Sequence, residues 1–453
     1  MPLLGAKSYV ITSPAMCQYA FRSKDLSFEP HMVEFFQRML NVSDATMSLL
    51  KVPANEKEPS MLRESSKAIH ESLTGDNLYR TNLKALESIS SMINGIDGCF
   101  TPDSLFRWLR LTLTLATSDA LYGSQNPFKI SKSLVESLWD FDAHVISFIM
   151  GIFPSFFIPK AHRGRAAVQA AFTEYFKNGY DLQPDVSPLV HSRAACYAKY
   201  GISLSDLGQL ELAIVHVATA NAIPTTFWTL LFIASSPTLT SLIRHELLTI
   251  TKPGSGNPER EININIAKFS SHCPLLVSCY REVIRLGNSN IGARRVMTDT
   301  TITDGTSTYL LKAGCNVQIP SGVIHMSEET WGPNASTFDA RRFLDPNLKG
   351  NITAKEREED RQRKKAYFPF GGGKHLCPGR NFAFAEILGL LSVLILGFEV
   401  RALDGGLVAV PKMGRSGVAE GMVKPTGKDL EMGVRIERRS GWEDAIWGFV
   451  SEQ

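Results

Sequence analysis

The segment FPFGGGKHLCPGR, residues 368–380, places a run of glycines and one cysteine directly before an apolar segment. Glycine lacks a side chain, so the backbone of this loop can approach a flat partner closely or turn its amides toward an anion. A helix is expected to begin near Arg380, and its positive dipole end favours a thiolate at Cys377. A thiolate presented in this way is a good soft ligand for iron.

Three interpretations of Cys377 compete. A single cysteine is most often a small buried hydrophobic residue. A phosphate-binding loop ending at Gly373 and Lys374 would need glycine at 368 and Ser or Thr at 375, where this chain has Phe368 and His375, so the spacing excludes it. The third interpretation is a proximal haem ligand, whose sulfur donates electron density to iron.

The composition is that of a globular protein. The chain has 453 residues, of which 44% are hydrophobic and 21% charged, and a net charge of +3 from 48 basic and 45 acidic residues. Basic and acidic residues nearly balance, without the positive excess that nucleic-acid-binding proteins carry, so no nucleic-acid partner is expected. The seven cysteines are scattered without a CxxC pair, which favours reduced thiols over a disulfide framework.

Helical periodicity dominates the chain, and the predicted fold class is mainly α with small β-sheets. Apolar residues recur at spacings of three and four in segments that include 32–40, 80–93, 104–116 and 165–178. Strand-like alternation is confined to 7–12, 294–303, 307–311 and 316–320. Stretches rich in Pro, Gly and charge at 251–261, 327–337 and 349–365 are predicted loops, and none is typical of a flexible tether, so one domain over 1–453 is expected.

No membrane-spanning segment is predicted. The first 21 residues lack a charged region followed by a long apolar run, which indicates neither a signal peptide nor an anchor. Of the apolar runs, 385–398 is short for a bilayer crossing, and 210–236 contains Glu211, His216, Asn221 and Pro224. Both are expected to be buried helices.

At the cysteine loop the sequence resembles the cytochrome P450 family. Phe370, Gly373, Cys377 and Gly379 match the haem-binding signature F-x-x-G-x-x-x-C-x-G, and Ala383 and Glu386 continue its extension. The resemblance implies the P450 fold, with haem b held between a long distal helix and the proximal Cys loop, and Cys377 as the axial thiolate ligand. It extends from the strand near the N-terminus to the C-terminal region.

Two upstream motifs agree with this resemblance. CYREVIRL supplies the E-x-x-R pair Glu282 and Arg285, and FDARRF supplies Arg342 at the F-x-P-x-R-F site, with Ala340 where the family usually has proline. Taken alone, Glu and Arg three apart on a helix are most often a solvated pair of small energetic value. In the family these three side chains form a buried charged triad that holds the segment beneath the haem.

The resemblance also implies cationic partners for the haem propionates. His375 lies where the family places Arg or His in the Cys loop, and Arg294 or Arg295 lies in the strand after the E-x-x-R helix, where Arg294 is our candidate. The family's W-x-x-x-R motif is absent around Lys67 and His70, so neither is taken as a ligand.

Residues 221–228, NAIPTTFW, align with the distal helix of the family. Thr225 falls at the threonine that assists proton delivery and Thr226 follows it, but Pro224 stands where most monooxygenases have an acid. A relay would then run through water, Asn221 or the substrate. A proline within a helix also bends it, which would open a groove over the haem.

The Asn-x-x-Pro pattern and the segment 141–168 resemble the branch of the family that contains cholesterol 7-alpha-hydroxylase and prostacyclin synthase. The implied activity is monooxygenation of a hydrophobic sterol-, terpenoid- or other lipid-like substrate. The alternative is a haem-thiolate isomerase that rearranges a peroxide without O2 or external electrons. Thr225 and Thr226 favour monooxygenation, and consumption of NADPH and O2 would discriminate the two. A haem protein without catalysis is the third class.

A monooxygenase of this kind needs an electron donor, because no dinucleotide-binding or iron–sulfur motif is present here. An NADPH-dependent reductase is the implied partner. The basic stretch RQRKK at 361–365 is a candidate docking surface, although a solvated mixed-charge loop fits it equally well. By resemblance the location would be the endoplasmic reticulum membrane, and without an anchor the contact could be peripheral, through 146–159.

Overall fold

The computed structural model describes residues 2–3, 6–52, 60–151, 153–254, 256, 260–345, 353–414 and 421–452. Its helices are α1 (Pro14–Arg22), α2 (Glu29–Leu40), α3 (Asp44–Leu50), α4 (Met61–Ser72), α5 (Gly75–Asn94), α6 (Leu105–Tyr122), α7 (Pro127–Ile130), α8 (Ser133–Asp142), α9 (Val145–Met150), α10 (Pro154–Phe157), α11 (Pro159–Lys177), α12 (Pro188–Lys199), α13 (Leu204–Thr219), α14 (Ala222–Ala234), α15 (Pro237–Leu248), α16 (Phe269–His272), α17 (Pro274–Gly287), α18 (Ser321–Ile324), α19 (Glu328–Trp331), α20 (Ala354–Ala366) and α21 (Arg380–Gly397).

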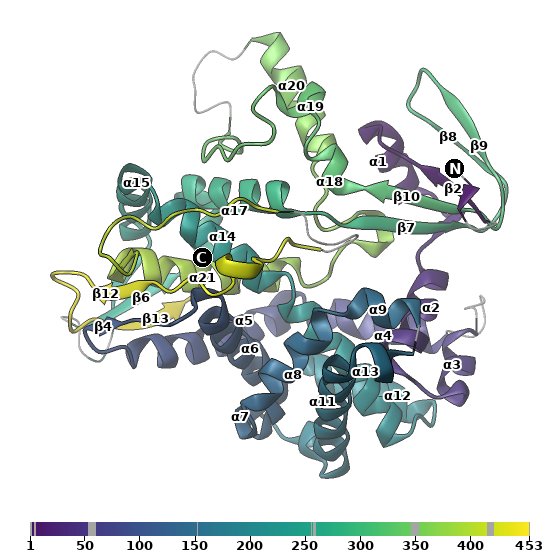
Figure 1. Cartoon of the computed structure of the whole chain (residues 1–453), viewed down its shortest axis with the longest axis horizontal. Helices are drawn as coiled ribbons and strands as arrows, with labels where there is room; N and C mark the ends of the chain where they lie inside the picture. Colours follow the sequence, from purple (N-terminus) through teal and green to yellow (C-terminus); the bar gives the residue numbers. More distant parts are fainter. Residues whose placement is uncertain are drawn as a thin grey trace.

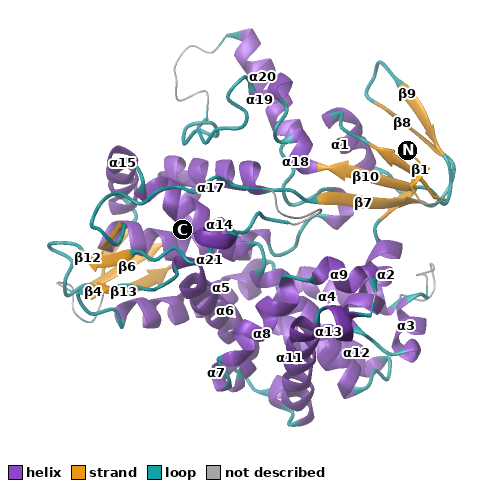
Figure 2. Cartoon of the chain, in the orientation of Figure 1, coloured by secondary structure: helices purple, strands orange, loops and turns teal. Residues whose placement is uncertain are grey.

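The strands are short, and several of them pair with strands that are distant in the sequence. They are β1 (Pro2–Leu3), β2 (Ala6–Val10), β3 (Leu26–Ser27), β4 (Cys99–Phe100), β5 (Thr251–Pro253), β6 (Glu261–Asn265), β7 (Ile291–Val296), β8 (Thr300–Thr303), β9 (Thr308–Leu311), β10 (Asn316–Pro320), β11 (Phe398–Arg401), β12 (Arg435–Arg438) and β13 (Ile446–Val450). The predicted class, mainly α with small sheets, is confirmed (Figure 2).

The largest sheet has the order β1-β2-β10-β7-β3 and lies apart from the main helical body (Figure 1). β10 pairs in parallel with β2 and antiparallel with β7, so this sheet joins the start of the chain to its last third. Smaller sheets have the orders β11-β12-β4 and β13-β6-β5, and β8 and β9 form a hairpin. The sheet thus fixes α1 and α2 near the segment that follows α17.

The core is built around α14 and α21. α21 packs against α5, α14 and α15, and its side chains from Ala385 to Gly397 are buried. Both α21 and the stretch Leu204–Ala234 are long and apolar enough to cross a membrane, but 78% and 72% of their most apolar windows are buried inside the protein. They are core helices, as predicted.

The segment 210–236 forms two helices. α13 ends at Thr219 and α14 begins at Ala222, so the break lies four residues before Pro224. A proline ring clashes with the carbonyl four residues earlier, here that of Ala220, which explains the position of the break. The backbone bond from Thr225 to the carbonyl of Asn221 is kept at 3.2 Å.

The loop prediction for 349–365 is wrong over its described part, because residues 354–366 form α20. Thr353 and Glu356 form a capping box that satisfies the first backbone amides. Pairs such as Lys364 with Asp360, at 2.6 Å, join successive turns of a helix that is almost wholly exposed and projects from the body (Figure 1). Residues 349–352 lie outside the described part of the chain.

Two other predicted loops contain short elements. β5 and the start of β6 lie within 251–261, where residues 255 and 257–259 are outside the described part, and α19 lies within 327–337. Each element is too short to show a period of its own, and β5 and β6 are held by pairing with each other and with β13.

Candidate active site

The Cys loop is held in shape by backbone bonds and by glycine. The amide of Cys377 donates to the carbonyl of Phe370 at 3.0 Å, and that of Leu376 donates to Gly373 at 3.2 Å. Gly373 has φ of +64°, and a Cβ there would lie 1.8 Å from the carbonyl oxygen of Phe21. Only glycine fits this position, because the backbone of α1 occupies the space of any side chain.

Cys377 is half-buried and stands directly before α21. Burial raises the pKa of the thiol, and the backbone amides of Gly379 and Arg380 together with the charge of Arg380 oppose that effect. The sequence predicts that the helix dipole favours the thiolate, but in the protein without a bound metal ion burial outweighs this effect and favours the thiol. A coordinated metal ion deprotonates a thiol outright, so the donor still suits iron.

The predicted triad is assembled. Arg285 donates from Nε and Nη2 to the two carboxylate oxygens of Glu282, both at 2.8 Å, and Arg342 donates from Nε to Glu282 Oε1 at 2.9 Å. The side chains of Glu282 and Arg285 are 0% exposed and that of Arg342 is 4% exposed. Nη1 of Arg342 donates to the carbonyl of Trp331. The charges are thus compensated inside the protein, as a buried ion pair requires.

The triad is joined to the Cys loop by a short chain of contacts. Arg285 donates to the carbonyl of His325, whose ring lies against Phe368 at 5.6 Å between centroids. Asn288, at the end of α17, donates to the carbonyl of Pro369 at 3.1 Å. The E-x-x-R helix therefore positions the start of the loop that carries Cys377.

A cluster of cationic groups lies beside the loop. The guanidinium of Arg294 is buried over the rings of Phe21 and Phe28, and Phe28 meets the ring of His375 edge-on at 5.8 Å. Arg294 donates to the carbonyl of Ala293 and has no ion pair among the described residues, whereas Arg295 pairs with Glu34 at 3.1 Å.

Burial and neighbouring charge lower the pKa values of the basic groups in this cluster. Burial, followed by the charge of Arg294, lowers the pKa of His375 to about 4, and burial lowers the pKa of Arg294 to about 10. Nε2 of His375 is buried without a hydrogen-bond partner among the described residues. Carboxylates placed here would satisfy these donors and offset both shifts, so the residues fit the propionates of a haem.

One histidine in this cluster is marked by no sequence motif. His31, on α2, is buried, and its Nε2 has no partner within the described residues. Burial lowers the pKa of His31, a hydrogen bond with the backbone of Arg294 raises it, and the charge of Arg295 lowers it. His70, on α4, which was not taken as a ligand from the sequence, acts on His375 through its charge.

The predicted distal residues lie at the start of α14. Thr225 and Thr226 are buried, and their hydroxyls donate to the carbonyls of Asn221 and Ala222 at 2.7 and 2.9 Å. The side-chain oxygen of Asn221 accepts the amide of Met422 at 2.9 Å. Asn221 therefore also joins the helix break to the C-terminal part of the chain, a role that the sequence pattern does not indicate.

α14 packs against both α17 and α21, the helices that carry the triad and follow the Cys loop. The predicted elements of the site therefore converge in one region. Among the described residues, no hydrogen bond joins Thr225 or Thr226 to the Cys loop.

Glu386, the last residue of the Cys-loop signature, is buried in α21. Its Oε1 accepts the hydroxyl of Thr117 at 2.5 Å, and Oε2 has no partner in the described part of the chain. Burial raises the pKa of this carboxyl to about 8, against which the Thr117 bond acts. At neutral pH the side chain is therefore a neutral acid.

Comparisons with known proteins agree with this geometry. The family model described as Cytochrome P450 matches residues 206–422. A cytochrome P450 monooxygenase of Gibberella zeae is 37% identical over 100% of this chain and 84% of that protein. Cytochrome P450 monooxygenase nodJ of Hypoxylon pulicicidum is 29% identical over 99% of this chain and 84% of its own length. The 5-beta-cholestane-3-alpha,7-alpha-diol 12-alpha-hydroxylase of Sus scrofa is 22% identical over 85% and 78%.

Proposed function

The chain belongs to the cytochrome P450 family, and from this premise we propose that it is a haem-thiolate monooxygenase acting on a sterol-, terpenoid- or other lipid-like substrate. We treat residues 1–453 as one P450 domain. The observation that carries the proposal is the loop presenting Cys377, joined through α17 to the buried triad of Glu282, Arg285 and Arg342.

When bound, haem b would supply the oxygen chemistry: one atom of O2 enters the substrate and the other leaves as water, with two electrons and two protons consumed. The chain's contribution is to hold and orient this group. Cys377 would supply the thiolate that holds the iron, and Phe370, Gly373 and Gly379 would shape the loop around this thiolate. Arg294 and His375 would hold the propionates, with His31 and His70 beside them.

Thr225, Thr226 and Asn221, at the start of α14, would bind water and pass protons. Each threonine hydroxyl gives its hydrogen to a backbone carbonyl, which leaves its oxygen free to accept a hydrogen bond from water. These groups lie at and just after the break between α13 and α14. No acidic side chain stands at Pro224, so water or a substrate hydroxyl would complete the path.

Two observations support a hydrophobic, lipid-like substrate. α14 is apolar and buried along almost its whole length, which suits a hydrophobic substrate. The name of the Sus scrofa relative indicates a sterol substrate for that protein. For this chain we propose the broader class, and with it steroid hydroxylase-like chemistry.

Electrons would come from an NADPH-dependent reductase docking near α20. In this helix Lys364 pairs with Asp360, whereas Lys365 has no ion pair among the described residues. Its charge is therefore free to meet an acidic partner. Charge reversal by Lys365→Glu should raise the KM for reductase, whereas Lys129→Glu, on α7, should leave it unchanged.

We also propose peripheral membrane contact, at the endoplasmic reticulum by resemblance, through α9 and α10. Exposed apolar side chains gather there: Met150 is 59% exposed, Phe153 73%, Phe156 77% and Phe157 63%. Such a cluster is unfavourable in water and typical of an interaction surface.

The test of the proposed function is the carbon monoxide difference spectrum of the dithionite-reduced protein. A strongly red-shifted Soret band is expected, and it should disappear in Cys377→Ala while Cys315→Ala, another thiol outside α17 and α21, retains it. A haem-free or differently ligated spectrum in folded wild-type protein would overturn the proposal. Consumption of NADPH and O2 with substrate would then separate a monooxygenase from an isomerase, which uses neither.

A further inference from the structure

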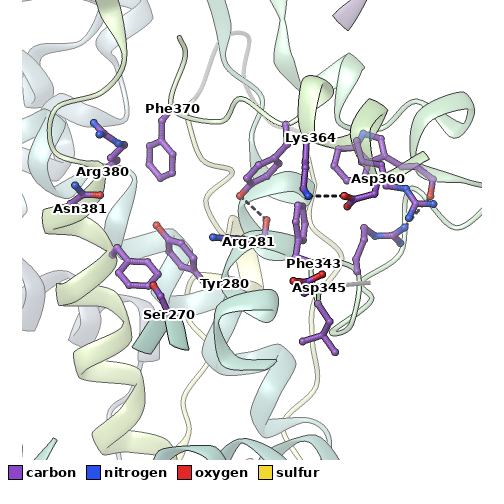
Figure 3. A pocket seen from close by; sticks show the side chains of 16 residues that line it. Ser270, Tyr280, Arg281, Phe343, Asp345, Asp360, Lys364, Phe370, Arg380 and Asn381 are labelled. Carbon is purple, nitrogen blue, oxygen red and sulfur yellow. Dashed lines mark hydrogen bonds and ion pairs between the residues drawn. The ribbon is translucent and has the colours of Figure 1, made fainter. Parts of the chain in front are cut away.

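A cavity of about 610 Å³ lies between α17, α20, α21 and the segment that carries Arg342 (Figure 3). Phe370 and Arg380 line one side of it, and the ion pair of Lys364 with Asp360 lines the other, with Arg281 between them. No residue of α14 lines it. Its volume falls in the range of small-molecule sites, so it offers room for a ligand separate from the proposed substrate.

Some of the basic side chains around this cavity form ion pairs and others do not. Arg342 belongs to the triad, Lys364 pairs with Asp360, and Arg363 pairs with Glu359 at 3.8 Å. Arg281 and Arg380 have no ion pair within the described part of the chain, and the one side-chain bond of Arg380 there goes to the carbonyl of Cys377 at 3.0 Å. Two guanidinium groups without an ion pair in the described part of the chain therefore line this space, which the carboxylates of Asp345 and Asp360 also line.

The wall beside these arginines is aromatic. Tyr280 is buried and meets Phe384 edge-on at 5.5 Å between ring centroids, and Phe370 closes the same end. Aromatic rings favour offset or edge contacts with another ring, and guanidinium groups bind carboxylates through charge-assisted hydrogen bonds. The cavity thus combines a place for a flat apolar body with unpaired positive charge.

We propose that this cavity is a binding site for an aryl carboxylate, distinct from the substrate site. The carboxylate meets the guanidiniums of Arg281 and Arg380, and the ring lies against Tyr280, Phe370 and Phe384. The proposal does not depend on the proposed monooxygenase activity, because every group that it uses belongs to the chain.

The experiment is titration calorimetry of the holoprotein with 2-naphthoate and with its neutral isostere 2-naphthamide. Saturable binding of 2-naphthoate is expected, with 2-naphthamide at least about tenfold weaker because a charge-assisted hydrogen bond is lost. Arg281→Gln should weaken 2-naphthoate about tenfold and remove its advantage over the amide. Arg357→Gln, an exposed arginine of α20 outside the cavity, is the matched control and should change nothing.

A second variant tests whether 2-naphthoate binds in this cavity and not elsewhere on the protein. Ser270 lies on the cavity wall and is exposed, so Ser270→Trp should fill the space without changing charge and abolish binding. The carbon monoxide spectrum of each variant should match that of the wild type, which shows an intact Cys loop. Absence of saturable binding, or affinity within twofold of the wild type in both Arg281→Gln and Ser270→Trp, would overturn the proposal.

Discussion

Thr225 gives its hydroxyl hydrogen to the carbonyl of Asn221, so its oxygen is left as an acceptor at the start of α14. If it receives and passes protons, Thr225→Ala should lower substrate oxidation per NADPH consumed by about tenfold or more, with hydrogen peroxide released instead. The measurement is the ratio of product to NADPH.

Thr229 is the control for this prediction. It is equally buried in the same helix, and its hydroxyl donates to the carbonyl of Thr225 at 2.7 Å. Thr229→Ala should keep the wild-type ratio. Equal ratios in wild type and Thr225→Ala would remove Thr225 from the catalytic role.

Glu386 makes stability depend on pH. Burial raises its pKa to about 8 in the folded protein, above the ordinary value of 4.5. Between these values the folded state holds a proton that the unfolded chain has released, so stability falls as pH rises, by up to about 1.4 kcal/mol per pH unit. Glu386→Gln cannot ionise and should flatten the dependence, measured by urea denaturation from about pH 5 to about pH 8. Parallel curves would contradict this.

Single site residues can be predicted from the sequence where they belong to a known motif. Cys377, Glu282, Arg285 and Arg342 were predicted from the resemblance of their motifs to those of the P450 family, and the structure brings Glu282, Arg285 and Arg342 into contact. His31 was not predicted, because its burial and its contacts with Arg294 and Arg295, more than 260 residues later in the sequence, arise only in the folded chain. A lone histidine carries no local signal of such a neighbour.

Among the elements, the Cys loop depends on one glycine that touches α1. Gly373→Ala would put a side chain at φ of +64° and 1.8 Å from the carbonyl of Phe21. We expect protein without bound haem and a loss of stability of several kcal/mol, measured by haem content and denaturation. Gly427→Ala is the control: its φ is +56° with no atom within 4 Å, so only about 1 kcal/mol should be lost. Comparable losses in the two variants would contradict the argument.

The triad joins α17 to the segment around Arg342. Glu282→Gln would leave two buried guanidiniums without a counter-charge, and we expect a loss of about 3–5 kcal/mol together with loss of holoprotein. Thermal unfolding and haem content measure this. Glu34→Gln removes a pair with Arg295 in which the Glu34 side chain is 58% exposed, and should cost about 1 kcal/mol or less. A similarly small loss in Glu282→Gln would show that the triad is not needed for folding.

The elements predicted from periodicity were those with a clear apolar stripe. α2, α5 and α6 have one, whereas α20 consists almost wholly of charged residues and is held by its capping box and by ion pairs between turns. The break between α13 and α14 follows from Pro224, but its position at Ala220 and Asn221 depends on the steric clash with the preceding turn.

Over the whole molecule, the apolar surface on α9 and α10 predicts binding to lipid. Replacing Phe153 and Phe156 by serine should weaken binding to vesicles of phosphatidylcholine and phosphatidylserine about tenfold or more, since two exposed rings no longer enter the interface. Sedimentation with vesicles measures this. Leu182→Ser, at a single residue that is 75% exposed elsewhere, is the control. Equal sedimentation of all three proteins would contradict the membrane contact.

Sheet topology is the part of the fold that the sequence did not reveal. Strand-like alternation marked β2, β7, β8, β9 and β10, but nothing local indicates that β2 pairs with β10 or β6 with β13. β4, β11 and β12 were not recognised, and they are held by pairing in the order β11-β12-β4, which no local pattern marks.

These pairings have a consequence for the order of synthesis. β2 must wait for β10, about 300 residues later, and β6 must wait for β13 at the end of the chain. As the ribosome releases the chain, β2 emerges with β1 on one edge, while its other edge stays open until β10 has been made. High contact order slows folding, so the nascent chain should rely on chaperones until residue 320 is available, and completion of the Cys loop should be a late step.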